Sequence, residues 1–186
     1  MVASKPSVRW PLRQPIPFAG CIECLLEPLQ LPVEHPLSLG LVQRGGTYQA
    51  NHACRQADVL MALGVRFDDR TSSSWIPGYS FTIPPTQLIH VDIDPEEIGR
   101  NYPVALGLMA DVRTFLRQII DELDRRGHSG GPTTESRKWL PAIGGYRAEW
   151  DAFVAPGMVD DSTPINPQRA AVEIDKALPE DAILVS

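Results

Sequence analysis

Two uninterrupted apolar runs constrain this chain more than any other feature, because each one ends directly in polar residues. The first run occupies residues 58–64 (DVLMALG) and the second occupies residues 87–94 (QLIHVDID). Continuous apolar runs of this length, unlike alternating ones, are typical of parallel strands that are covered on both faces. The sequence therefore predicts two neighbouring strands of a parallel sheet.

Polar side chains gather where each predicted strand ends. Arg66, Asp68, Asp69 and Arg70 follow the first strand. Ligands of open parallel sheets bind beyond the carboxyl ends of the strands, so this cluster predicts part of a nucleotide-type pocket. A solvated, salt-bridged turn that contributes about 0–1 kcal/mol is the competing interpretation, and the residues alone leave both open.

The second strand carries acids and a histidine. Asp92 ends it, and a carboxylate in that place can accept the hydroxyls of a ribose. Asp94 fits an N-cap better than a ligand, with Pro95 at the first helical position and Gly99 ending a one-turn helix. His90 lies inside the apolar run, where a hydrogen-bonded sheet histidine is expected rather than a catalytic one.

The neighbouring segments alternate between strand and helix patterns. Residues 48–57 predict a helix capped by Thr47, residues 104–111 a third strand, and residues 112–126 a helix capped by Asp111. This alternation is the signature of a parallel α/β unit. The glycine pair at 45–46 before the first helix is either a simple turn or a loop that lets a ligand approach helix amides, and both remain open.

The two ends of the chain differ from this unit. Residues 1–30 hold five prolines and no sustained period, which predicts an irregular arm. Cys21 and Cys24 form a lone CxxC without a second ligand pair, so a metal site is not expected there. After a glycine-rich linker at 127–134, we expect a helix at 135–153, a helix at 167–178 capped by Asn166, and a strand from 182.

Composition excludes several classes of protein. The 186 residues carry a net charge of −6 and no run of lysine and arginine, so a nucleic-acid partner is not expected. No segment reaches the roughly 18 apolar residues that a membrane helix needs. Three cysteines argue against a disulfide framework, and no leader pattern is recognised, so a cytoplasmic protein is predicted.

Several linked segments resemble the central domain of thiamine-diphosphate enzymes, with acetolactate synthase and its relatives as the nearest match. The segments are GTYQAN at 46–51, GVRFDDR at 64–70, HVDIDPEEIG at 90–99, and the AD pairs at 57–58 and 110–111. The resemblance implies an α/β fold with a six-stranded Rossmann-like parallel sheet over residues 31–127. It also implies an FAD or ADP site formed by Gly64, Arg66, Asp68, Arg70, Asp92 and Asp111.

The resemblance also sets limits on the expected activity. Residues 1–30 are unmatched, 128–163 would be a linker with a helix, and 164–186 would begin the thiamine-diphosphate-binding catalytic domain. The activating glutamate and the Gly-Asp-Gly and Asn motif for Mg²⁺ are absent, so no catalytic or metal-binding residue is assigned. Thiamine diphosphate and Mg²⁺ are expected in a full-length, homo-oligomeric parent that condenses or decarboxylates 2-oxo acids in branched-chain amino acid biosynthesis.

The chain alone is therefore expected to be a catalytically inactive fragment of that transferase, contributing its nucleotide-binding part. Two alternatives stay open from the sequence. One is a free-standing nucleotide-binding or regulatory module, and the other is a non-functional truncated product.

Overall fold

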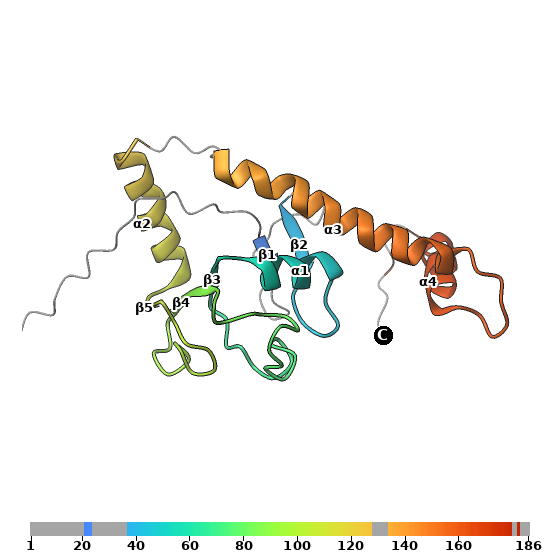
Figure 1. The fold of residues 1–186 in the computed structure, drawn as a ribbon, viewed down its shortest axis with the longest axis horizontal. Coiled ribbons are helices and arrows are strands. Elements are labelled where there is room, and N and C mark those ends of the chain that lie inside the picture. Colours follow the sequence, from blue (N-terminus) through green and yellow to red (C-terminus); the bar gives the residue numbers. More distant parts are fainter. Residues whose placement is uncertain (1–20, 24–36, 128–133, 180–181, 183–186) are drawn as a thin grey trace, which may run out of the picture.

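A computed structural model describes residues 21–23, 37–127, 134–179 and 182 of the chain (Figure 1). The elements in order are β1 (Cys21–Glu23), β2 (Ser38–Leu41), α1 (Tyr48–Gln56), β3 (Val59–Leu63), β4 (Gln87–Asp92), β5 (Leu106–Met109), α2 (Val112–Arg125), α3 (Thr134–Met158) and α4 (Pro167–Ala177). None of the helices in the described part of the chain is long and apolar enough to cross a bilayer.

The central layer is a parallel sheet with the order β3-β4-β5. β3 and β4 pair from Val59 opposite Gln87 to Leu63 opposite Val91. β4 and β5 pair from Ile89 opposite Leu106 to Asp92 opposite Met109. The predicted parallel α/β fold is confirmed. Of the six strands that the resemblance implies, the described residues form these three, with β1 and β2 as a separate parallel pair.

Burial is uneven across the three strands. In the central strand β4, Leu88 and His90 are 1% exposed and Val91 is fully buried. These side chains meet the expectation for a strand covered on both faces. β5 differs, because its residues are mostly exposed although its sequence is apolar. The apolar pattern therefore predicted the strand correctly but not its position at the edge of the sheet.

Three predicted helix starts are confirmed by their caps. The Thr47 hydroxyl accepts a hydrogen bond from the Ala50 amide at 3.3 Å. The Asp111 carboxylate accepts one from the Thr114 amide at 2.8 Å, and the Asn166 side-chain oxygen accepts one from the Gln168 amide at 2.9 Å. Such caps satisfy amides that have no partner within the helix, which explains why a local sequence signal suffices to place them.

Two local predictions need correction. Residues 95–99 form successive turns rather than a one-turn helix, although Asp94 does accept the Glu96 amide at 2.9 Å as expected for a cap. Gly99 has φ +74°, a conformation that ends helical winding. The helix α3 runs through Pro156 to Met158, beyond the predicted end at 153. Its final turn packs closely against α4, because a Cβ at Gly157 would collide with the Gln168 side chain.

Part of the N-terminal segment 1–30, which was predicted to be irregular, is a strand. Cys21–Glu23 pairs in parallel with β2, a contact that three residues could not reveal locally. The described residues do not include the rest of residues 1–30, among them Cys24. Of the predicted strand at 182–186 they include only Ala182.

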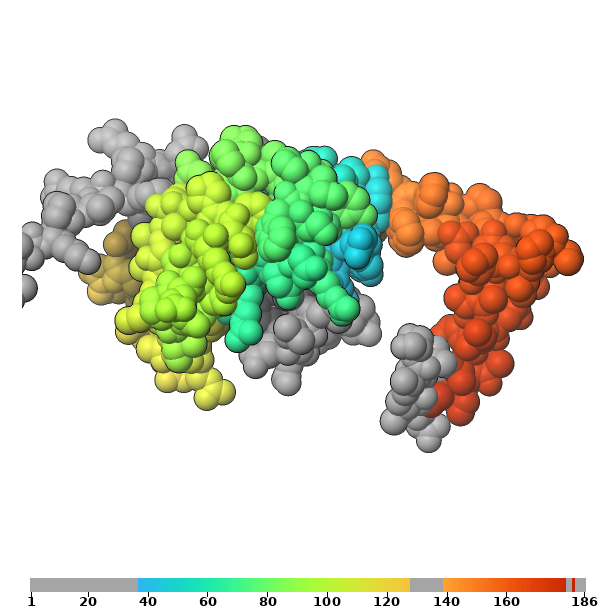
Figure 2. Space-filling view, turned by 90° about the horizontal axis from the view of Figure 1, so that it is seen from below, coloured from blue at the N-terminus to red at the C-terminus, as the bar shows by residue number. Residues whose placement is uncertain are grey.

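α3 crosses over α1 and β2 and then continues away from the sheet to α4 (Figure 1). The Tyr146 hydroxyl donates to Gln56 Oε1 at 2.7 Å, and the Tyr48 hydroxyl donates to Glu149 Oε2 at 2.9 Å. Arg147 donates to the Ser38 carbonyl. Beyond these contacts, the end of α3 and α4 project from the body as an arm, drawn in orange and red in Figure 2.

Candidate functional site

The carboxyl ends of β3, β4 and β5 lie on one edge of the sheet. The Gly64 amide, which follows β3, donates to the Val91 carbonyl at 2.8 Å. The Ala110 amide, which follows β5, donates to the Asp92 carbonyl at 3.0 Å. Three of the predicted site residues, Gly64, Asp92 and Asp111, are thereby brought to the same edge, where parallel sheets bind their ligands.

Position 64 favours glycine because of its backbone conformation, and not because neighbouring atoms leave no space for a side chain. Its φ is +64°, a value that residues with a Cβ adopt at a cost. A Cβ at this position would meet only Val112 Cγ2, at 3.8 Å. The chain therefore turns sharply at the end of β3 and leaves its backbone open to close approach by a ligand.

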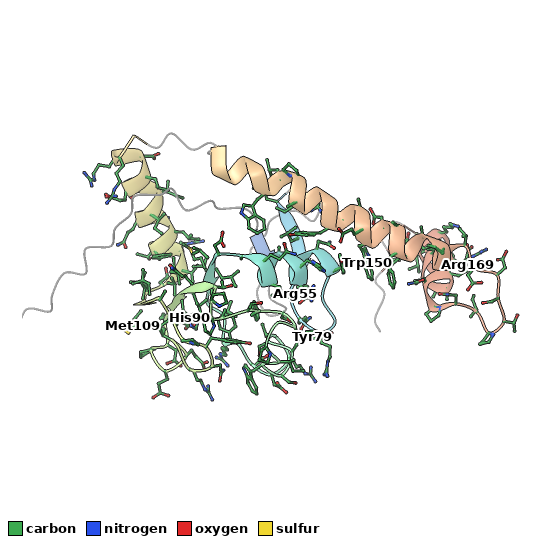
Figure 3. All side chains as sticks on the ribbon, in the orientation of Figure 1. Arg55, Tyr79, His90, Met109, Trp150 and Arg169 are labelled. Atoms are coloured by element: carbon green, nitrogen blue, oxygen red, sulfur yellow. The ribbon has the colours of Figure 1, made fainter. Side chains whose placement is uncertain are left out.

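His90 connects the loops on both sides of this edge. Its Nε2 lies 2.8 Å from the Val65 carbonyl, and its Nδ1 accepts from the Gly99 amide at 3.4 Å. A neutral imidazole that donates from Nε2 and accepts at Nδ1 satisfies both contacts. Figure 3 shows it within the sheet region. The expectation of a hydrogen-bonded sheet histidine is confirmed, and its role is to position the loops after β3 and β4.

Phe67 anchors the polar loop after β3, a role that the sequence analysis did not assign. It is buried with φ +50°, which is an outlier for a bulky residue. Its ring makes edge contacts with Phe81, Tyr102 and His90 at centroid distances of 5.3–5.4 Å. The sequence did contain a signal for this role, because Phe67 is an apolar residue within a polar cluster. Burial of its side chain explains why it occurs there.

The Phe67 carbonyl oxygen also holds the loop after β3 in place, through two side-chain hydrogen bonds. It accepts hydrogen bonds from Trp75 Nε1 at 2.9 Å and from Asn101 Nδ2 at 3.0 Å. Asn101 belongs to the loop after β4, so this contact ties the two ligand-side loops together. Asn101 was likewise missed, because nothing in its local sequence indicates a contact across 34 residues.

The charged residues that flank Phe67 point away from the core. Arg66, Asp68, Asp69 and Arg70 are all exposed. The region is a solvated turn, as the competing interpretation expected, but none of the ion pairs formed between described residues includes Arg66 or Arg70. Asp68 Oδ1 accepts the Thr71 amide at 2.7 Å, and this bond lowers the pKa of Asp68. The arginines keep their planar donors available for an anion.

The two strand-end acids use one oxygen for structure. Buried Asp92 accepts the Asp94 amide at Oδ1, at 2.9 Å. Asp111 accepts both the amide and the hydroxyl of Thr114 at Oδ1, each at 2.8 Å, and the amide bond is the main cause of its lowered pKa. All hydrogen bonds that described residues donate to these two carboxylates fall on Oδ1. Each acid therefore caps its own turn and retains a second acceptor.

The glycine pair before α1 is explained by a turn. The Gly46 amide donates to the Gln43 carbonyl at 2.9 Å, and the Thr47 amide donates to the Leu41 carbonyl at 2.8 Å. A Cβ at Gly46 would collide with the Leu41 carbonyl oxygen. Of the two alternatives that the sequence left open, the turn accounts for this glycine without a ligand.

Other reactive groups do not gather near this edge. Within the described ranges, no three His, Cys, Asp or Glu side chains are arranged to hold a metal ion. Cys54 is a buried free thiol, and burial raises its pKa to about 12, so it is not a nucleophile at neutral pH. Among the described residues, this edge presents guanidinium donors and carboxylate acceptors, the groups that an anionic ligand with hydroxyl groups would require.

The part of the chain that contains this site is similar to known proteins. Residues 29–119 match the profile of "Thiamine pyrophosphate enzyme, central domain". The chain is 34% identical to a "Probable acetolactate synthase large subunit" of Methanocaldococcus jannaschii, over 80% of this chain and 23% of that protein. It is 35% identical to the acetolactate synthase isozyme 3 large subunit of Escherichia coli K12, over 63% and 20%, and 32% identical to acetolactate synthase 1, chloroplastic, of Zea mays, over 82% and 22%.

The matched region is thus less than a quarter of the length of each of these three relatives.

Proposed function

Because this chain belongs to the thiamine pyrophosphate enzyme family through its central domain, we propose that its sheet edge binds the ADP part of a nucleotide, either FAD or ADP itself. The observation that carries the proposal is the convergence of Gly64, Asp92 and Asp111 at the ends of three adjacent parallel strands. Parallel sheets of this kind bind nucleotides at that edge.

The residues present fit such a group in three respects. The positive φ of Gly64 lets a phosphate or ribose approach the backbone. Arg66 and Arg70 are exposed on a loop that Phe67 and Asn101 hold in place. Each guanidinium offers several donors in one plane, which suits phosphate oxygens. The second carboxylate oxygens of Asp92 and Asp111 would accept ribose hydroxyls or an adenine amine.

Asp68 has a supporting part in this proposal. Its carboxylate holds the loop through the Thr71 amide and adds negative charge beside Arg70. It would orient that arginine rather than contact phosphate, because two anions repel each other.

The parent reaction is a broader proposal. The relatives are named acetolactate synthases, and we propose that a full-length, homo-oligomeric parent decarboxylates or condenses 2-oxo acids. Thiamine diphosphate supplies that carbanion chemistry when bound. The described residues do not fit thiamine diphosphate or Mg²⁺, since they include no metal-ligand cluster. We therefore assign the chain a nucleotide-binding role and no chemical step, and we propose a cytoplasmic location, in keeping with the free Cys54 thiol.

Titration of the purified chain with ADP, FAD and FMN tests the proposal. We expect saturable binding of ADP and FAD by calorimetry and no binding of FMN, which lacks the ADP part. Arg66→Ala should weaken ADP binding about tenfold, as expected for loss of one charge-assisted hydrogen bond. Arg117→Ala is the matched control, because Arg117 is an exposed arginine on α2 away from the loop.

Two outcomes would reject the assignment. One is the absence of saturable ADP or FAD binding up to about 1 mM ligand, a concentration at which even weak sites fill. The other is an equal loss of affinity in the Arg66 and Arg117 variants, which would show that net charge rather than the site governs binding.

A further inference from the structure

The outer strand β5 leaves one side of its backbone without a partner in the described structure. It is the last strand in the order β3-β4-β5. The Ala110 amide donates to the Asp92 carbonyl, and backbone groups alternate in direction along a parallel ladder. Leu106, Leu108 and Ala110 therefore face β4, and the amides and carbonyls of Gly107 and Met109 face outward.

This edge lacks most of the usual protections against pairing with another strand. Natural edge strands are kept very short or carry charged residues, prolines or bulges that block another strand, and of these β5 has only its short length of four residues. Its sequence is Leu-Gly-Leu-Met, without a charged residue or a proline. Leu106 is 39% exposed and Met109 is 69% exposed. Figure 3 shows Met109 at the rim of the molecule, on the side of the sheet away from Arg55 and Trp150.

We propose that β5 pairs in antiparallel fashion with β5 of a second copy of this chain. The two three-stranded sheets would join into one continuous sheet of six strands across a two-fold axis. Such a symmetric contact closes on itself, whereas a contact between β5 and a different strand would propagate into a filament. The inference does not depend on nucleotide binding.

Charge selects the antiparallel arrangement. The carboxyl end of β5 lies beside Asp92 and Asp111, while the residues before it, 102–105, are uncharged. A parallel pair would place the acids of both copies side by side, and like charges at that distance repel. The antiparallel pair places the acids of each copy beside the uncharged end of the other.

The side chains of β5 are complementary to those of a second β5. The outward-facing residues Gly107 and Met109 form the hydrogen-bonded pairs, so Met109 of one copy lies opposite Gly107 of the other. The space above Gly107 is bounded by Ile98, whose Cγ2 would lie 2.6 Å from a Cβ there. Met109 would thus rest on Ile98 of the other copy, and on the opposite face Leu108 would meet Leu108 at the axis.

A cysteine at the axis provides the sharpest test. Leu108 would form a non-hydrogen-bonded pair with its own copy at about 4.5 Å between Cα atoms, within the range for a disulfide. Leu108→Cys should yield a cross-linked dimer under mild oxidation, above the level that the native cysteines give in the unsubstituted chain. Leu106→Cys is the matched control, because its two copies would lie about 13 Å apart along the strands.

Sedimentation velocity tests the same contact without a covalent cross-link. The unsubstituted chain should show a monomer–dimer equilibrium up to about 200 µM, and Met109→Pro should abolish the dimer by removing an outward amide. Met109→Lys, which keeps the backbone intact, should do the same through charge. Met109→Leu should retain the dimer.

The proposal is overturned by a monomeric unsubstituted chain at about 200 µM, or by dimers that survive both Met109→Pro and Met109→Lys. Equal cross-linking at positions 106 and 108 would also overturn it. Circular dichroism on every variant establishes that a lost dimer reflects the edge and not unfolding.

Discussion

The sheet unit (residues 58–111) and the arm (residues 150–177) differ in how they treat apolar side chains. In the sheet unit, Leu88, His90 and Val91 are almost completely buried. In the arm, Phe153 is 73% exposed, and α4 has no buried residue at all. Both regions are regular structure, yet most of the buried apolar surface that stabilises a fold lies in the first, because Val154 is the one buried side chain among the described residues of the arm.

Local signals rather than burial specify the arm. Asn166 caps α4 and Pro167 occupies its first turn. Arg169 pairs with Asp161 at 2.7 Å and with Glu173 at 3.0 Å. Exposed ion pairs of this kind contribute little, typically below about 1 kcal/mol. A helix can therefore be encoded locally while the surface that would stabilise it is left uncovered.

Matched truncations provide the strongest test of this difference. Leu88→Ala should lower the free energy of unfolding by about 2–5 kcal/mol, because it leaves a cavity in the centre of the sheet. Phe153→Ala removes a larger side chain and should change the same quantity by less than about 0.5 kcal/mol. Urea unfolding followed by circular dichroism measures both. Similar losses in the two variants would show that the arm is buried in solution.

The helix caps of the two regions should also differ in how far their loss is felt. Asp111→Ala and Asn166→Ala remove equivalent caps in the two regions, each worth about 1 kcal/mol. We expect Asp111→Ala to shift the global unfolding midpoint. We expect Asn166→Ala to increase amide hydrogen exchange only within α4, because a region with little burial opens locally. Accelerated exchange throughout β3 and β4 in the Asn166 variant would contradict that separation.

The smallest expected effect concerns His52, which lies on α1 where that helix contacts α3. Its ring lies 4.3 Å from that of Tyr48 and 5.3 Å from that of Tyr146, and its buried Nδ1 has no hydrogen-bond partner among described residues. Burial, followed by the nearby Arg55, lowers the pKa of His52, while Glu149 opposes the shift. The unfolded state therefore binds a proton more readily than the folded one.

The contribution of His52 to the free energy of unfolding is therefore complete above the unfolded histidine pKa of about 6.5. It declines as the pH falls below that value. The decline should be smaller than the effect of losing a cap, since the ring is partly exposed. Urea midpoints at pH 7.5 and pH 5.5 measure it. His52→Phe should reduce the difference between them, and an unchanged difference would assign the pH dependence to other groups.

Much of the candidate site could be predicted from the sequence because its parts are local. Gly64, Asp92 and Asp111 follow apolar runs whose parallel pairing brings their ends together. What the sequence could not reveal were contacts between distant loops. Phe67 turns into the core against Phe81 and Tyr102, and Asn101 reaches the Phe67 carbonyl, although none of these residues has a local partner that would signal the contact.

The amino-acid sequence was enough to predict the three strands of the central sheet, the helices α1 to α4 and their order, but not the strand pair β1 and β2. Apolar period, caps and glycines with positive φ act over a few residues, so a short window contains all the physics they need. Three features became apparent only in the folded chain: β5 is an exposed edge, α3 extends past Pro156, and α4 remains uncovered. Burial depends on which surfaces meet across the whole chain, and apolar letters in a sequence do not specify their neighbours.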